Sequence, residues 1–209
     1  MGMPFPRLLL GLFVPLCLGA QEGDPLTTVW NGVQRAQKEN TSACGKIVET
    51  RTSALLARPM VFRGKFCTEG LDRFSLEYIE PEPMRILFNK DYLNVTTGGG
   101  RTTEVMDVGA NVRRTQAYFS KDNSLANLRK TFDIALSREP GLYVMTMAPR
   151  TESFRRKINR IVIKLDAAQF LLRSLEVDGS SGVTSVFRIE MTSLNARIPA
   201  GTFDVYRPK

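Results

Sequence analysis

The side chains that most enzymes use to transfer protons or to hold metals are scarce in this sequence. None of its 209 residues is histidine, which excludes Ser-His-Asp and Cys-His nucleophiles and histidine-based zinc sites. Glu77, Glu80 and Glu82 could supply the paired carboxylates of glycoside hydrolysis. However, Glu77 alternates onto the polar side of a predicted strand, and the other two flank Pro81 in a turn, so solvated surface is the better interpretation. We predict a non-enzymatic protein without metal or cofactor; a lysine- or carboxylate-based site is the enzymatic alternative.

Basic residues outnumber acidic ones and are densest in one short stretch. The 29 lysines and arginines exceed the 21 acidic residues and give a net charge of +8. The densest run consists of Arg150, Arg155, Arg156, Lys157 and Arg160. Such a run can bind an acidic protein or lipid headgroups, and Arg155, Arg156 and Arg160 are the candidate partner-binding residues. The alternative is a charged loop and strand edge that prevents aggregation between sheets.

Residues 1–20 have the features of a cleaved secretory signal. Arg7 provides a positive start, residues 8–18 form an apolar run, and Ala20 supplies a small residue at the predicted cleavage point. The run is too short for a membrane span, which needs about 20 apolar residues. Acylation of Cys17 in a lipoprotein is the less favoured alternative, because the residue before that cysteine is large. We therefore expect a periplasmic protein, and export removes nucleic acid from the partners of this basic chain.

The exported part, residues 21–209, is of a size for one domain and retains two cysteines. Cys44 and Cys67 fall in two predicted strands, and a hairpin between these strands would place the cysteines nearly opposite each other. An exported compartment permits a disulfide, and we predict one between this pair. The same register places Lys46 opposite Lys65, which is an unfavourable like-charge pair.

The hydrophobic pattern predicts two amphipathic helices and many short strands. Asp24-Pro25 begins a helix that runs to about Lys38. Ser124 caps a second predicted helix from Leu125 to Leu136, which Pro140-Gly141 ends. Elsewhere apolar residues alternate with polar ones, which predicts strands joined by tight turns in an antiparallel sheet. The predicted strands cover residues 41–55, 59–68, 73–78, 84–89, 92–96, 142–148, 158–166, 170–177 and 184–194.

One side of this predicted sheet carries large apolar side chains, and the other side is largely charged. Only two or three short helices are available to cover the apolar side. A strongly curved sheet with helices over its opening would enclose an apolar space, the usual form of a lipid-binding site. A packed core would give the same pattern, so the sequence leaves both open. The candidate lining residues are Phe62, Phe66, Phe74, Leu76, Tyr78, Ile86 and Phe88.

Several motifs follow one another in an order known from a family of exported proteins. Gly64-Lys65-Phe66-Cys67 precedes Arg73-Phe74-Ser75-Leu76-Glu77-Tyr78, and Pro81 follows three residues later. The strands at 142–149, 158–166 and 170–177 are followed by Asn195, Ile198-Pro199 and Phe203. Together these segments span nearly the whole exported part, and they resemble the outer-membrane lipoprotein carrier family (LolA-like), of which this chain would be a divergent member.

The resemblance implies an α+β fold, mostly antiparallel β, in which a strongly curved sheet forms an incomplete, half-open β-barrel covered by short lid helices. It implies a monomeric periplasmic carrier that shelters the acyl chains of lipoproteins or other lipids and moves them towards the outer membrane. Inner- and outer-membrane transport proteins would be its partners. Gly70 stands where the best-known carriers have an arginine that holds the lid closed, and Leu71 replaces a proline. We therefore expect a different lid mechanism or cargo. The alternative is an exported sensing or scaffold domain that binds an acidic protein.

Overall fold

The computed structural model describes residues 24–107 and 125–205. The helices among these residues are α1 (Pro25–Glu39), α3 (Leu125–Thr131) and α4 (Glu152–Arg155), and a short 3-10 helix, η1, covers Gly98–Gly100. The strands are β1 (Ser42–Ser53), β2 (Met60–Glu69), β3 (Arg73–Glu80), β4 (Met84–Asn89), β5 (Tyr92–Thr97), β6 (Thr102–Asp107), β7 (Phe132–Glu139), β8 (Leu142–Pro149), β9 (Ile158–Asp166), β10 (Leu172–Gly179) and β11 (Val183–Leu194).

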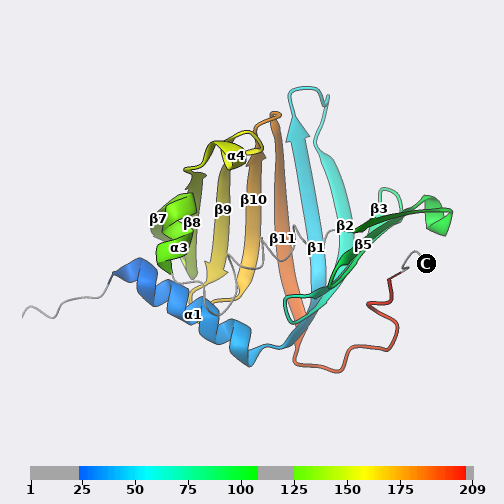
Figure 1. Ribbon diagram of the computed structural model, residues 1–209, viewed down its shortest axis with the longest axis horizontal. Coiled ribbons are helices and arrows are strands. Elements are labelled where there is room, and N and C mark those ends of the chain that lie inside the picture. Colours follow the sequence, from blue (N-terminus) through cyan, green and yellow to red (C-terminus); the bar gives the residue numbers. More distant parts are fainter. Residues whose placement is uncertain (1–23, 108–124, 206–209) are drawn as a thin grey trace, which may run out of the picture.

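All eleven of these strands belong to one antiparallel sheet with the order β6-β5-β4-β3-β2-β1-β11-β10-β9-β8-β7. Strand β1 lies at the centre, where it pairs with β2 and with the last strand, β11. The edge strands β6 and β7 are not paired with each other, so the sheet stays open. In Figure 1 the strands β3–β5 turn at a steep angle to β7–β11 and give the sheet a concave side. The predicted fold class, a strongly curved and half-open antiparallel sheet with short helices, is confirmed.

Two glycines lie where neighbouring strands approach each other most closely. The pairing of β1 with β11 shifts its register next to Gly45, and the pairing of β2 with β3 shifts next to Gly64. A Cβ atom at Gly45 would lie 2.2 Å from the carbonyl oxygen of Glu190, and one at Gly64 would lie 2.3 Å from that of Glu77. Any other residue would push these strands apart. Because such irregularities bend a strand and increase its twist, these two positions help to curve the sheet.

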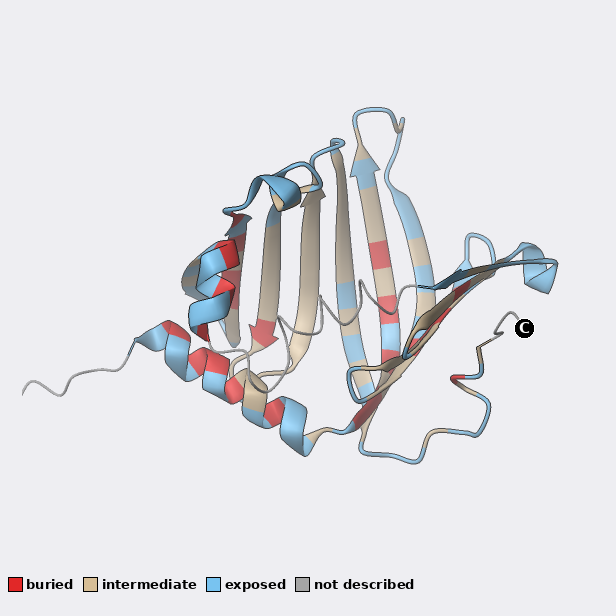
Figure 2. Cartoon of the chain, in the orientation of Figure 1, coloured by how far each residue is buried: buried red, intermediate tan, exposed pale blue. Residues whose placement is uncertain are grey.

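Helices α1 and α3 fill one half of the concave side. Asp24 caps α1 by accepting a hydrogen bond from the Leu26 amide at 3.2 Å, and Pro25 occupies the first helical position. Figure 2 shows buried positions on both helices and on the strands β7–β9 beside them. The buried core of this half consists of Leu26, Val29, Trp30, Leu125, Leu128, Phe132, Met145, Met147 and Leu165. The α1 helix predicted from Asp24-Pro25 is therefore confirmed, with its apolar face packed on the sheet.

The second predicted helix, Leu125–Leu136, is wrong in its C-terminal part. Helix α3 ends at Thr131, and the next residue, Phe132, begins strand β7. Strand β7 pairs with β8 along its whole length, so Pro140-Gly141 is the turn of a hairpin and does not end a helix. Phe132 stands at a spacing from Leu125 that suits one helix face as well as the first position of a strand. The pairing with β8, which local periodicity does not report, decides between the two. The predicted cap, Ser124, lies outside the described residues.

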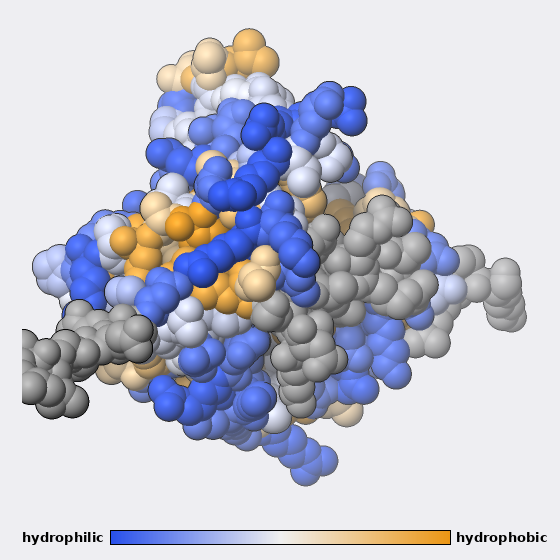
Figure 3. Space-filling view, turned by 60° about the vertical axis from the view of Figure 1, so that its left-hand side comes forward, coloured by the Kyte–Doolittle hydropathy of each residue, from blue (hydrophilic) through white to orange (hydrophobic). Residues whose placement is uncertain are grey.

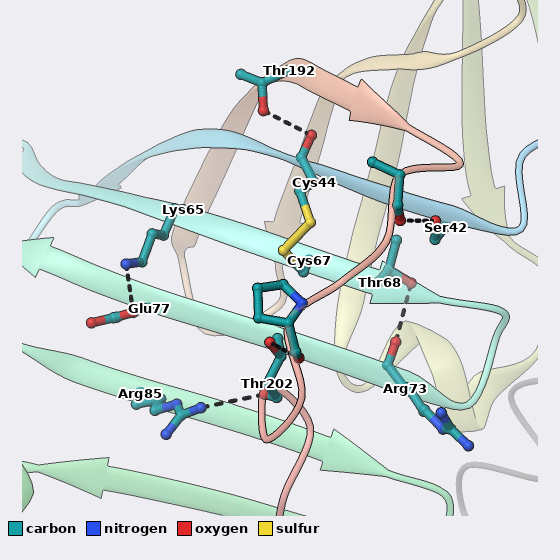
Figure 4. Close-up of a disulfide and its surroundings, with 12 residues drawn as sticks. Ser42, Cys44, Lys65, Cys67, Thr68, Arg73, Glu77, Arg85, Thr192 and Thr202 are labelled. Atoms are coloured by element: carbon teal, nitrogen blue, oxygen red, sulfur yellow. Dashed lines mark hydrogen bonds and ion pairs between the residues drawn. A yellow bond between two sulfur atoms is a disulfide. The ribbon is translucent and has the colours of Figure 1, made fainter.

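The outer side of the sheet, which was predicted to be largely charged, is also covered in part. The segment after β11 crosses the outer side of the N-terminal strands, as Figure 4 shows near the disulfide. Its Phe203 is buried together with Leu87 and Ser75, which face outward from β4 and β3. The Asn89 side-chain amide donates to the Phe203 carbonyl at 2.8 Å, and Arg85 donates to the Thr202 carbonyl at 3.3 Å. A non-repetitive segment of this kind gives no periodic signal, so the sequence pattern did not reveal the cover.

The predicted disulfide between Cys44 and Cys67 is confirmed (Figure 4). The two cysteines are direct partners in the β1–β2 hairpin, in the predicted register. That register also places Lys46 opposite Lys65, as expected. The ammonium group of Lys65 is 3.1 Å from the Glu77 carboxylate on β3, so a neighbouring strand supplies the opposite charge.

Candidate functional site

A groove of about 810 Å³ opens on the concave side, between strands β1–β4 and strands β10–β11. Small-molecule sites in proteins usually measure roughly 300–1,000 Å³, so the groove is large enough for a ligand. It lies beside the half of the sheet that the helices fill. Most of its wall is apolar, and the groove is therefore suited to a ligand with a large apolar part.

The apolar residues of the concave side fall into two clusters with different surroundings. The cluster on β7–β9 is covered by α1 and α3. The second cluster has Ile47, Phe66, Leu76 and Tyr78 as its buried members, and half-buried residues such as Phe187 pack against them. All five of these residues line the groove. The sequence left open whether the interior is packed or hollow, and among the described residues one half is packed and the other half borders the groove.

The predicted lining residues are distributed as follows. Five of the seven line the groove: Phe66, Phe74, Leu76, Tyr78 and Ile86. Phe62 packs against the same cluster, and its ring lies 5.4 Å from that of Tyr78, centroid to centroid. Phe88 is half-buried and pairs with Phe74 in the β3–β4 register, but it does not line the groove. Whether these residues bind lipid stays a prediction.

Strands β10 and β11 supply a second wall of the groove, whose residues were not among the predicted lining residues. Its members alternate along the two strands, and they are Leu175, Val177, Val183, Ser185, Phe187, Ile189 and Met191. The period-two pattern from Val183 to Met191 could have indicated one face of a strand. It could not show that this face lies opposite Phe66 and Leu76. The strands of the two walls are far apart in the sequence, and only the pairing of β1 with β11 brings them together.

A hydrogen-bonded polar cluster interrupts the apolar wall. At its centre is the carboxylate of Glu49, whose side chain is 2% exposed and which accepts hydrogen bonds from three neighbouring residues. Arg51 donates to its Oε1 atom from Nε at 3.1 Å and from Nη2 at 2.8 Å. The Ser185 hydroxyl donates to Oε1 at 3.0 Å, and the Tyr78 hydroxyl donates to Oε2 at 2.6 Å. The cluster thus joins strands β1, β3 and β11 across the groove wall.

The phenol of Tyr78 is held in its neutral form by these surroundings. Burial raises the pKa of Tyr78 above its ordinary value of 10, because an ion is poorly solvated there. The hydrogen bond to the Glu49 carboxylate raises this pKa further, since the bond requires the phenol proton. Tyr78 is therefore a hydrogen-bond donor to Glu49 throughout the neutral pH range. Its ring lines the groove.

The predicted basic residues lie on α4, on β9 and on the turn between them, and each contacts another residue of the chain. Arg155 ends α4 and donates from Nε to the Pro149 carbonyl at 3.0 Å. Arg156 lies 3.5 Å from Glu152, and Arg160 on β9 lies 2.9 Å from Glu176. The interpretation of this run as a partner-binding surface is not tested by these contacts and stays a prediction.

One further apolar feature is exposed at the end of the β1–β2 hairpin. Leu55 at this end exposes 93% of its surface, and apolar side chains stand at the top of Figure 3, where the hairpin ends. Leu55 does not line the groove. The groove, in which apolar residues from six strands meet, is therefore the better candidate site.

The described residues include neither a metal-binding cluster nor a helix that could span a membrane. Within residues 24–107 and 125–205, no three Cys, Asp or Glu residues are grouped closely enough to hold a metal ion. None of the helices in the same ranges is both long enough and apolar enough to cross a membrane.

No family model and no curated protein matches this sequence. Among solved structures, an uncharacterized conserved protein from Thermus thermophilus matches with a TM-score of 0.50 and 9% identity, over 88% of this chain and 100% of that one. A LolA superfamily protein from Nitrosomonas europaea matches with a TM-score of 0.44 and 11% identity, over 85% and 96% of the two chains. The MucA/MucB complex of Pseudomonas aeruginosa matches with a TM-score of 0.44 and 12% identity, over 86% and 60%. A LolA superfamily protein is among the solved structures to which this chain is similar, and at these identities each likeness concerns the fold alone.

Proposed function

We propose that this protein is a periplasmic carrier that binds the acyl chain of a lipoprotein or another lipid in the groove and moves it towards the outer membrane. One observation carries the proposal. Helices fill one half of the concave side, whereas the apolar wall of the other half borders a groove of about 810 Å³. Removing apolar surface from water is worth roughly 25 cal/mol per Å², so an acyl chain that lies along this wall gains affinity from most of its length.

The proposed compartment rests on the sequence and on the disulfide. Residues 1–20 are predicted to be a secretory signal, and disulfides persist in oxidising compartments such as the periplasm. The bond between Cys44 and Cys67 suits that location. Transport proteins of the inner and outer membranes would load and unload a carrier of this kind.

Acyl-chain binding is tested by placing a charge in the groove wall. In Phe187→Asp a carboxylate replaces a ring that lines the groove on β11, and burying an unpaired charge is costly. We expect the affinity for a fluorescent fatty acid, titrated into the purified protein, to fall by more than about tenfold. The measurement is the increase in fluorescence as the protein concentration rises.

The matched control is Val186→Asp, the neighbouring position on the same strand. Successive side chains of a strand point to opposite sides, and Val186 lies on the outer side beside Lys46 and Arg188. This variant should bind the fatty acid as the unmodified protein does. Failure of the unmodified protein to take up the probe, or equal affinity in all three proteins, would overturn the proposal.

A further inference from the structure

The groove is polar at one end and apolar along the rest of its length. Glu49 and Arg51 are the charged residues among the described residues that line it. Arg51 is opposite Ser185 in the β1–β11 register, close to the ends of both strands. Met191 on β11 and Phe74 on β3 line the groove at its other end, level with residues 43–45 of β1. The groove therefore has the polarity of an amphiphile, with a charged end and an apolar body.

Glu49 is buried and already paired within the chain. Its Oε1 atom accepts bonds from Arg51 and Ser185, and its Oε2 atom accepts one from Tyr78. Its side chain is 2% exposed, so a ligand in the groove does not reach these oxygens easily. A buried carboxylate is costly unless it is paired and hydrogen-bonded. Here three neighbours satisfy it, and its effect on the groove is exerted through the arginine that it holds.

Arg51 is the member of the cluster that is left facing a ligand. Its Nε and Nη2 atoms are committed to Glu49, and its guanidinium carbon lies 4.9 Å above the centre of the Phe62 ring. A guanidinium has five N–H donors, and no described residue accepts a bond from the Nη1 atom of Arg51. The side chain is 40% exposed. Fixed on two sides, it presents the remaining N–H groups at the polar end of the groove.

If the groove is the acyl-chain site proposed above, these observations indicate the charge of the ligand's head group. We propose that the groove selects amphiphiles with an anionic oxygen head, a carboxylate or a phosphate, which Arg51 binds while the apolar chain extends towards Phe74 and Met191. A guanidinium donates to such oxygens in a charge-assisted geometry. A cationic head is disfavoured here, because the Glu49 carboxylate is 2% exposed and already forms an ion pair with Arg51. Glu49, Tyr78 and Ser185 act as positioning residues for the arginine.

The test compares ligands that share one chain and differ only in the head. Hexadecanoate, hexadecyl phosphate, hexadecanol and hexadecyltrimethylammonium are titrated below their aggregation concentrations, as competitors of the fluorescent fatty acid. We expect one or both anions to bind about tenfold more tightly than the alcohol, the size of effect typical of a charge-assisted bond. The cation should bind no better than the alcohol. The two anions distinguish a carboxylate site from a phosphate site.

Variants identify the group responsible. Arg51→Met should lose the preference for the anions and keep its affinity for the alcohol, whereas Arg63→Met, which removes an exposed arginine on the neighbouring strand, should keep the preference. An unmodified protein that binds all four heads alike, or a preference that survives in Arg51→Met, would overturn the inference and leave acyl-chain binding intact. No binding of any of the four ligands would overturn the proposed function as well. If a variant does not fold, the affinities of the unmodified protein for the four ligands still test the inference.

Discussion

At the residue scale, the bond between Tyr78 and Glu49 makes the groove wall sensitive to alkaline pH. The phenol proton lies in a bond of 2.6 Å between two buried side chains. Ionisation of Tyr78 would place two negative charges side by side. Because its pKa is raised in the folded protein, the folded state holds this proton more tightly than the unfolded state does.

The sign of the pH effect follows from this difference. The stability that Tyr78 contributes is fully present below the unfolded pKa of about 10, and it is lost as the pH rises from there through the folded pKa. We expect the free energy of unfolding to fall above about pH 10, and to fall less steeply in Tyr78→Phe. Denaturant midpoints measured over this alkaline range check the prediction. Equal slopes in the two proteins would show that Tyr78 is not the group involved.

The sequence correctly predicted that Tyr78 lines the apolar side of the sheet. It did not predict the hydrogen bond between Tyr78 and Glu49. The alternation of Tyr78 with Glu77 indicates which side of β3 it faces. Its partners, Glu49 and Ser185, lie on β1 and β11, and only the order of strands in the sheet brings them together. For the same reason, no local pattern in the sequence indicates that Arg51 borders the groove.

At the element scale, the disulfide ties the β1–β2 hairpin near the centre of the sheet. Cys44 and Cys67 are 23 residues apart, and a bond that closes a loop of this length stabilises by roughly 3 kcal/mol on the chain-entropy estimate. We expect the double variant Cys44→Ala, Cys67→Ala to lose about that much free energy of unfolding. The measurement is denaturant unfolding of both proteins without a reducing agent.

A reducing agent supplies the control for this prediction. It should lower the midpoint of the unmodified protein to that of the double variant and leave the variant unchanged. A variant as stable as the oxidised protein would show that the hairpin does not depend on the bond.

The elements that the sequence predicted well are those whose signals are local. The cap and proline at Asp24-Pro25 define α1, and alternation with tight turns defines the hairpins. The boundary between α3 and β7 was missed because Phe132 fits both periods. The cover formed around Phe203 was missed because its contacts with Leu87 and Asn89 are made by a segment without regular structure.

At the scale of the whole molecule, one curved sheet serves two purposes. The half around β7–β9 packs against α1 and α3 and forms the buried core. The half around β1–β4, with β10 and β11 as the opposite wall, borders the groove. The pairing of β9 with β10 joins the two halves. A protein built in this way can keep a stable core while part of its apolar surface stays available to a ligand.

The affinity of the protein for a series of fatty acids of increasing chain length tests this account most directly. If the chain is buried along the groove wall, each added methylene that enters the groove contributes up to about 0.8 kcal/mol, which is roughly a fourfold increase in affinity. We predict a steep rise with chain length that levels off when the groove is filled, and the same head throughout the series keeps the contribution of Arg51 constant. An affinity that does not change with chain length would contradict the account, because the apolar wall would then not be the binding surface.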